Sequence, residues 1–133
     1  MKTKTSKKRI LIVDDEASFT RNLKLNLEKT GQYEVAAVNH SRLAVAVANA
    51  FKPDLILLDV MMPVLDGGDV LACVKADPGL KNVPVIVVTA NVKAQEVDSF
   101  RGVIGGYPFL AKPVGLAKLL GCIEANLQDK PRG

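Results

Sequence analysis

Short, continuously apolar runs recur along this chain and restrict its fold more than any other feature. Residues 10–13, 55–58 and 85–88 are entirely apolar, and residues 33–38 and 109–111 are two further strand candidates. A strand that is apolar on both faces is typical of a parallel sheet covered by helices on both sides. The runs are too short to cross a membrane as helices.

Helical patterns lie between these runs. Phe19, Leu23 and Leu27 recur every four residues and predict a helix over residues 17–29, which Gly31 would end. Further helices are predicted from Gly67 to just before Asp77, over residues 92–101, and over residues 116–127.

The segment after the second strand is ambiguous. Residues 43–48 alternate like a strand, but Ser41 as a helix cap, the alanines and Pro53 beyond the end favour a helix running to residue 51. In that helix Leu43, Val47 and Phe51 would share the buried face.

Five strands alternating with five helices predict one α/β domain. We expect a doubly wound (βα)5 fold, with a five-stranded parallel sheet in the flavodoxin-like order 2-1-3-4-5. The domain is expected over residues 9–128, between a basic N-terminal tail (1–8) and a C-terminal tail (129–133). Its ligand crevice should lie at the carboxyl ends of strands one and three, where the strand order reverses.

The net charge of +4 is concentrated at the N-terminus. Residues 1–9 carry five of the 18 Lys and Arg and no acid, which leaves 13 − 14 = −1 for the rest of the chain. A near-neutral domain without a basic helix predicts no direct nucleic-acid contact. With no signal peptide and two cysteines, Cys73 and Cys122, that lack metal spacing, we expect a cytoplasmic protein that binds no membrane.

Acidic residues follow two of the predicted strands. Asp14 and Asp15 come directly after the first strand, and Asp59 after the third. In the order 2-1-3-4-5 these strand ends are neighbours, so the three carboxylates should converge. Hard oxygen ligands beside water suit Mg²⁺. Alone, Asp15 or Glu16 could instead cap the following helix.

The two remaining strands end on a hydroxyl and an ammonium. Thr89 closes the fourth strand and Lys112 follows the fifth, so both should face the same crevice. Carboxylates, a divalent ion, a hydroxyl and a lysine together are typical of phosphoryl transfer.

These motifs resemble the response-regulator receiver domains, the CheY-like family, over about residues 8–128. The resemblance rests on residues 10–16 (ILIVDDE), 57–63 (LLDVMMP), 66–67 (DG), 88–90 (VTA) and 109–113 (FLAKP). It implies a receiver domain in two-component signal transduction. Such a domain is not a conventional enzyme, because it catalyses only its own phosphorylation and dephosphorylation.

The resemblance implies roles for the acids. Asp59 would accept a phosphoryl group from the phosphohistidine of a sensor histidine kinase or a phosphotransfer protein. Asp15 and Asp59 would hold Mg²⁺ directly with the backbone carbonyl of Met61, while Asp14 supports the ion through water. Lys112 would pair with the phosphoryl group.

The resemblance also implies a switch. Thr89 would move toward the phosphoryl group, the small Ala90 would leave it accessible, and Phe109 would take the aromatic switch position, although a plain core aromatic is an equal alternative. Gly67 would permit the turn after the phosphorylation loop, and the peptide before Pro113 would be cis. The switched surface, formed by residues 92–101, 109–111 and 116–127, would bind an output partner or a second copy of the chain.

Three alternatives remain open. A haloacid-dehalogenase-type phosphatase with an aspartate nucleophile places a general-acid Asp two residues after it, where this chain has Met61. A flavodoxin would need Ser, Thr and Gly after the first strand, where Asp14, Asp15 and Glu16 would repel a phosphate. A degenerate receiver that only binds partners would not need the full set of acids, Thr and Lys. Pro108, placed just before the last predicted strand, is a departure from the family pattern at the output surface, because proline cannot donate to the ladder.

Overall fold

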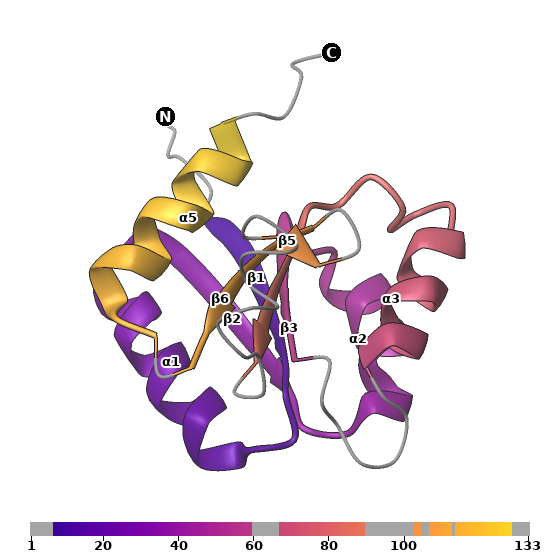
Figure 1. Ribbon diagram of the computed structural model, residues 1–133, viewed down its shortest axis with the longest axis horizontal. Coiled ribbons are helices and arrows are strands. Elements are labelled where there is room, and N and C mark those ends of the chain that lie inside the picture. Colours follow the sequence, from indigo (N-terminus) through magenta and orange to yellow (C-terminus); the bar gives the residue numbers. More distant parts are fainter. Residues whose placement is uncertain (1–6, 60–66, 90–102, 105–106, 113, 129–133) are drawn as a thin grey trace.

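The computed structural model describes residues 7–59, 67–89, 103–104, 107–112 and 114–128 (Figure 1). A parallel sheet lies between two layers of helices. Its strands are β1 (Lys8–Val13), β2 (Tyr33–Val38), β3 (Leu55–Leu58), β4 (Val85–Thr89) and β6 (Tyr107–Ala111), with a two-residue strand β5 (Val103–Ile104) at the edge. The helices are α1 (Ala17–Lys29), the 3-10 helix η1 (Ser41–Leu43), α2 (Ala44–Phe51), α3 (Gly67–Ala76) and α5 (Leu116–Gln128).

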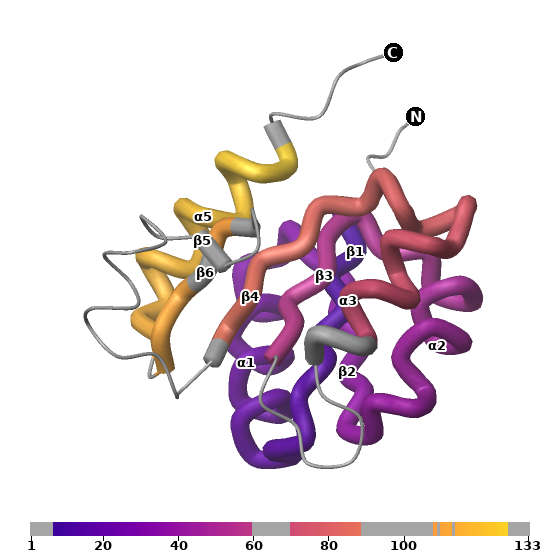
Figure 2. Tube along the Cα trace, turned by 45° about the vertical axis from the view of Figure 1, so that its right-hand side comes forward, coloured from indigo at the N-terminus to yellow at the C-terminus, as the bar shows by residue number. Residues whose placement is uncertain are grey.

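The strand order confirms the predicted fold class. The five parallel strands run β2-β1-β3-β4-β6, which is the order 2-1-3-4-5 with β6 as the fifth parallel strand (Figure 2). The chain passes from β1 to β2 at one edge and then returns across β1 to β3. Val13 is in register with both Val38 and Leu58, so β1 and β3 end side by side at the point where the order reverses.

Alternate residues of the central strands enter two separate cores. Ile12 and Leu57 pack with the cluster that includes Leu27 of α1 and Ile123 of α5. Their sequence neighbours Val13 and Leu58, among others, pack on the opposite face, in the cluster that includes Ala48 of α2 and Val74 of α3. Figure 1 shows α1 and α5 on one side of the sheet and α2 and α3 on the other. Both faces of the sheet are buried against helices, which is why its central strands are continuously apolar.

Three of the predicted helices occur with nearly the predicted bounds. Leu23 and Leu27 are buried in α1, and Gly31 follows its end with a left-handed φ of 78°. Val70 and Val74 are buried in α3, and Leu119 and Ile123 in α5. The predicted helix over residues 92–101 lies outside the described residues. Within the described ranges, no helix has both the length and the apolar character needed to cross a membrane.

The buried face of α2 differs from the prediction. Leu43 is 51% exposed, whereas Ala44 and Ala48 are buried. Val47 and Phe51 are only partly buried at the margin of the core. Ser41 is not a cap either, because it begins η1, and α2 starts at Ala44. The prediction assigned the buried face of α2 to its large side chains, whereas the small side chains of Ala44 and Ala48 form that face.

The last parallel strand is longer than predicted. β6 begins at Tyr107, so Pro108 lies inside it and not before it. The pairing of β6 with β4 starts only at Phe109, while Pro108 lies opposite Val103 of β5. Proline lacks an N–H and cannot donate to a sheet, and here it lies outside the parallel β4–β6 pairing.

Candidate functional site

Three carboxylates converge at the carboxyl ends of β1 and β3. Asp14 follows β1 and Asp59 follows β3, and the N–H of Asp59 donates to the carbonyl of Val13 at 2.9 Å. One oxygen from each of Asp14, Asp15 and Asp59 lies within 4.8 Å of the others. Asp14 and Asp59 are buried, whereas Asp15 is exposed. The strand order therefore places these side chains together as the sequence predicted.

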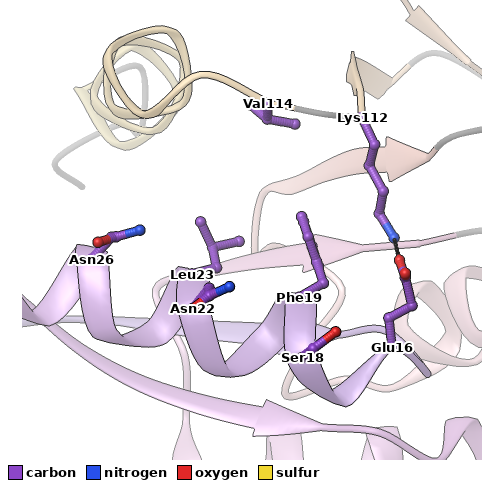
Figure 3. A pocket seen from close by; sticks show the side chains of 8 residues that line it. All are labelled: Glu16, Ser18, Phe19, Asn22, Leu23, Asn26, Lys112 and Val114. Atoms are coloured by element: carbon purple, nitrogen blue, oxygen red, sulfur yellow. Dashed lines mark hydrogen bonds and ion pairs between the residues drawn. The ribbon is translucent and has the colours of Figure 1, made fainter.

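Lys112 extends from the end of β6 into this group of acids. Its Nζ lies 2.6 Å from Asp14 Oδ2, 2.8 Å from Glu16 Oε1 and 3.4 Å from Asp59 Oδ2. It also lies 4.2 Å from the centre of the Phe19 ring, in cation–π contact. Figure 3 shows Lys112 reaching toward Glu16 at the start of α1. One largely buried ammonium thus faces three carboxylates.

Burial and neighbouring charges shift the pKa values of Asp14 and Lys112. Burial of Asp14, with the nearby charge of Asp59, raises the pKa of Asp14 despite hydrogen bonds from Lys112 and the Glu16 N–H. Burial of Lys112 lowers its pKa, but the carboxylates of Asp14, Glu16 and Asp59 outweigh that effect and hold the pKa above its ordinary value. The negative charge exceeds what one lysine neutralises.

The donor set suits a hard divalent cation. Asp14 Oδ2 is buried and lies 2.6 Å from the Lys112 ammonium, and no other described group donates a hydrogen bond to it. Asp15, in contrast, faces solvent. Carboxylate oxygens of this kind, some buried and some beside water, are the ligands that Mg²⁺ prefers. The described residues therefore form an acidic cluster that could hold a metal ion.

Comparison with known proteins assigns the chain to a family. Residues 10–124 match the response regulator receiver domain. The chain belongs to the response regulator receiver domain family. Receiver domains act as phosphoacceptors in two-component signalling, not as conventional enzymes, and the match supports this reading over the haloacid-dehalogenase-type alternative.

Curated relatives of this receiver domain are longer proteins. It is 34% identical over 131 residues to the DNA-binding response regulator MtrA of Mycobacterium tuberculosis, an alignment covering 96% of this chain and 55% of MtrA. It is 36% identical over 122 residues to the alkaline phosphatase synthesis transcriptional regulatory protein PhoP of Bacillus subtilis, covering 91% of this chain and 49% of PhoP. The chain spans about half the length of these relatives.

Solved structures agree on the receiver fold. The signal receiver domain of a signal transduction histidine kinase from Syntrophus aciditrophicus is 33% identical, with a TM-score of 0.78 over 95% of this chain and 94% of that one. The chemotaxis protein CheY4 of Vibrio cholerae is 28% identical, with a TM-score of 0.76 over 90% and 98% of the two chains.

Several predicted site residues can be placed only in part. Thr89 ends β4 with its backbone beside Ala111, the residue before Lys112, but its side chain lies outside the description, as does that of Phe109. Gly67 is the first residue of α3. Met61, Ala90 and Pro113 fall in the undescribed segments.

The structure adds three residues that the sequence did not assign to the site. Glu16, considered as a helix cap and as part of the acidic run after β1, binds Lys112 and makes no side-chain cap. Phe19, assigned to the core stripe of α1, also lies beneath the Lys112 ammonium. Asn39 hydrogen-bonds the carbonyl of Asp14. Its place directly after β2, at the same edge of the sheet, was the available signal.

A groove opens beside the acids, between α1 and the segment that follows β6. Its volume is about 500 Å³. Figure 3 shows Phe19, Leu23 and Val114 facing one another across it, with Glu16 and Lys112 at one end. Ser18, Asn22 and Asn26 complete the lining. The receiver domain thus has an open surface next to its buried charges.

Proposed function

We propose that this receiver domain accepts a phosphoryl group on Asp59 from a phosphohistidine, in a Mg²⁺-dependent reaction. The observation that carries the proposal is the convergence of Asp14, Asp15 and Asp59 on one small volume with Lys112 beside them. Separate strand ends contribute these groups, so helix capping alone does not account for their position.

The chemistry follows from the positions of the side chains. A carboxylate oxygen of Asp59 attacks phosphorus, a P–O bond forms, the P–N bond of the donor breaks, and its electron pair returns to the imidazole. Lys112, 3.4 Å from Asp59, offsets the charge that the phosphoryl group brings. Mg²⁺ held by Asp15, Asp59 and the Met61 carbonyl, with Asp14 behind them, would neutralise phosphoryl oxygens.

The switch residues complete the proposal. The Thr89 hydroxyl binds a phosphoryl oxygen, Ala90 leaves room for it, and Phe109 rearranges with them. Gly67 would support the turn before α3, and the family resemblance implies a cis peptide before Pro113. Their roles rest on the family resemblance, supported by the backbone position of Thr89 beside β6.

The partners follow from the same reaction. The phosphodonor is a sensor histidine kinase or a phosphotransfer protein in the cytoplasm. The output partner, or a second copy of the chain, binds the surface formed by residues 92–101, β6 and α5. We assign no nucleic-acid contact to this domain because its charge beyond residue 9 is close to zero.

A labelling experiment tests the acceptor. The protein is incubated with Mg²⁺ and a small acyl phosphate, and its intact mass is measured. We expect one added phosphoryl group in the wild type and in Asp77→Asn, a control acid in the loop after α3 that contacts Asn49. We expect none in Asp59→Asn or with a chelator. Labelling of Asp59→Asn, or labelling without metal, would contradict the proposal.

The same samples test the phosphatase alternative. Sustained hydrolysis of a small phosphoester by the wild type would favour an aspartate-nucleophile phosphatase. Met61 occupies the position at which that class carries its general-acid Asp, so we expect no such turnover.

A further inference from the structure

We propose that Asn39 is a positioning residue for the metal site. Its side chain fixes the peptide that joins Asp14 to Asp15 and thereby sets the direction in which Asp15 presents its carboxylate. This inference rests on the proposed function, because it concerns the Mg²⁺ that the acids would hold.

Asn39 lies at the end of β2, one strand away from the acids. Its Nδ2 donates to the backbone carbonyl of Asp14 at 2.8 Å and to Thr20 Oγ1 at 2.9 Å. The Thr20 hydroxyl, which is 2% exposed, donates in turn to the carbonyl of Ala17 at 3.0 Å. The amide of Asn39 therefore links the ends of β1 and β2 to the first turn of α1.

Besides its ion pair with Lys112, Asp14 is held by three hydrogen bonds, and the one from Asn39 holds the carbonyl that leads into Asp15. The N–H of Asp14 donates to the carbonyl of Val38 at 3.0 Å, which extends the β1–β2 ladder by one residue. Its Oδ1 accepts from the N–H of Glu16 at 2.9 Å. The carbonyl that Asn39 holds belongs to the peptide between Asp14 and Asp15. Rotation of that peptide would swing the exposed Asp15 away from the other two acids.

The chemistry of this position requires a donor. A carbonyl oxygen only accepts, so the group facing it must carry N–H or O–H, and an amide nitrogen can serve both Asp14 and Thr20 at once. Partners of this kind, one step removed from the metal, change metal affinity by about 10- to 100-fold when they are lost. Asn39 acts through a backbone group, so the lower end of that range applies.

Direct binding of Mg²⁺ tests the proposal. Isothermal titration of the folded protein with MgCl₂ should give a dissociation constant about tenfold higher for Asn39→Leu than for the wild type. Thr20→Val, which removes only the hydroxyl that anchors the amide, should shift it in the same direction by less. Asn49→Leu, which loses the hydrogen bond from an exposed Asn to Asp77, is the matched control and should bind as the wild type does.

A second readout separates positioning from simple destabilisation. In labelling with an acyl phosphate, Asn39→Leu should need about tenfold more Mg²⁺ for half-maximal rate but approach the wild-type rate at saturation. If Asn39→Leu does not fold, Asn39→Ser, whose hydroxyl is too short to reach both partners, replaces it.

The outcomes separate the role of Asn39 from the proposed phosphorylation of Asp59, on which it rests. Equal Mg²⁺ affinity in the wild type and the Asn39 variant would overturn the role of Asn39 and leave phosphorylation at Asp59 intact. A wild type that binds no Mg²⁺ would overturn both. A fall in melting temperature with an unchanged Mg²⁺ midpoint would show a structural role only and would also overturn the inference.

Discussion

Lys112 is the residue on which most of the charge at the site depends. Its Nζ contacts Asp14, Glu16 and Asp59, and its side chain is only 9% exposed. An ammonium among carboxylates occupies the kind of position that a divalent cation also favours. The lysine and a metal ion would therefore both neutralise the carboxylates of Asp14 and Asp59.

This overlap predicts the behaviour of Lys112→Met. The variant leaves the buried Asp14 without its counter-ion, so its free energy of unfolding at pH 7 should fall by about 1–3 kcal/mol. Added Mg²⁺ should stabilise the variant more than the wild type, because it restores the missing positive charge. Urea unfolding with and without Mg²⁺ measures both effects. Lys118→Met, at an exposed position of α5, is the control, and equal stability of Lys112→Met and wild type in metal-free buffer would contradict the account.

Glu28 links one element to the next. Its Oε2 accepts from the N–H of Val35 in β2 at 3.1 Å, and its Oε1 forms an ion pair with Lys24 in α1 at 3.2 Å. The hydrogen bond from Val35 is the main reason that the pKa of Glu28 lies below its usual value of 4.5, and Lys24 adds to the shift. The carboxylate thus stabilises the contact between α1 and β2 when it is ionised.

Glu28→Gln should therefore show a pH-dependent cost. The folded-state pKa is lowered, so the stabilisation is present above pH 4.5 and is lost as the pH falls through the folded-state value. The difference in unfolding free energy between wild type and Glu28→Gln should be larger at pH 7 than at pH 3. Denaturant melts at both pH values measure it.

Lys24→Met serves as the companion variant. It removes the ion pair and leaves the hydrogen bond from Val35, so it should retain most of the wild-type pH dependence. A Lys24→Met protein that loses the whole dependence would assign the effect to the ion pair and not to the β2 backbone.

At the scale of the whole molecule, two cores share one sheet. Leu57 belongs to the cluster under α1 and α5, and its neighbour Leu58 to the cluster under α2 and α3. Both side chains are almost fully buried. Because β1, β2, β3 and β4 each contribute side chains to both clusters, we expect the two cores to be lost together.

Leu57→Ala and Leu58→Ala should each destabilise the entire domain by about 2–5 kcal/mol. The unfolding transitions measured by far-UV circular dichroism and by tyrosine fluorescence should coincide in both variants. This is expected even for Leu58→Ala, whose cluster does not contain Tyr33, because Tyr33 lies in the cluster of Leu57. Leu25→Ala, at a residue of α1 that is 54% exposed, should change stability by less than about 0.5 kcal/mol. Separate transitions in Leu58→Ala would show that the two cores unfold independently.

The sequence by itself determined the five parallel strands, most of the helices, the order of those strands and the meeting of Asp14, Asp15 and Asp59, but not the short edge strand β5. The strands and helices follow from periodicity within a few residues. The meeting of the acids follows from the rule that parallel strands end at one edge of the sheet. The tertiary structure alone decided the buried face of α2, the start of β6, and the contacts of Glu16 and Asn39. Lys112 and Glu16 are 96 residues apart, and Asn39 and Asp14 are 25 apart. Such contacts depend on how separate elements pack, and the local pattern around a residue does not contain that information.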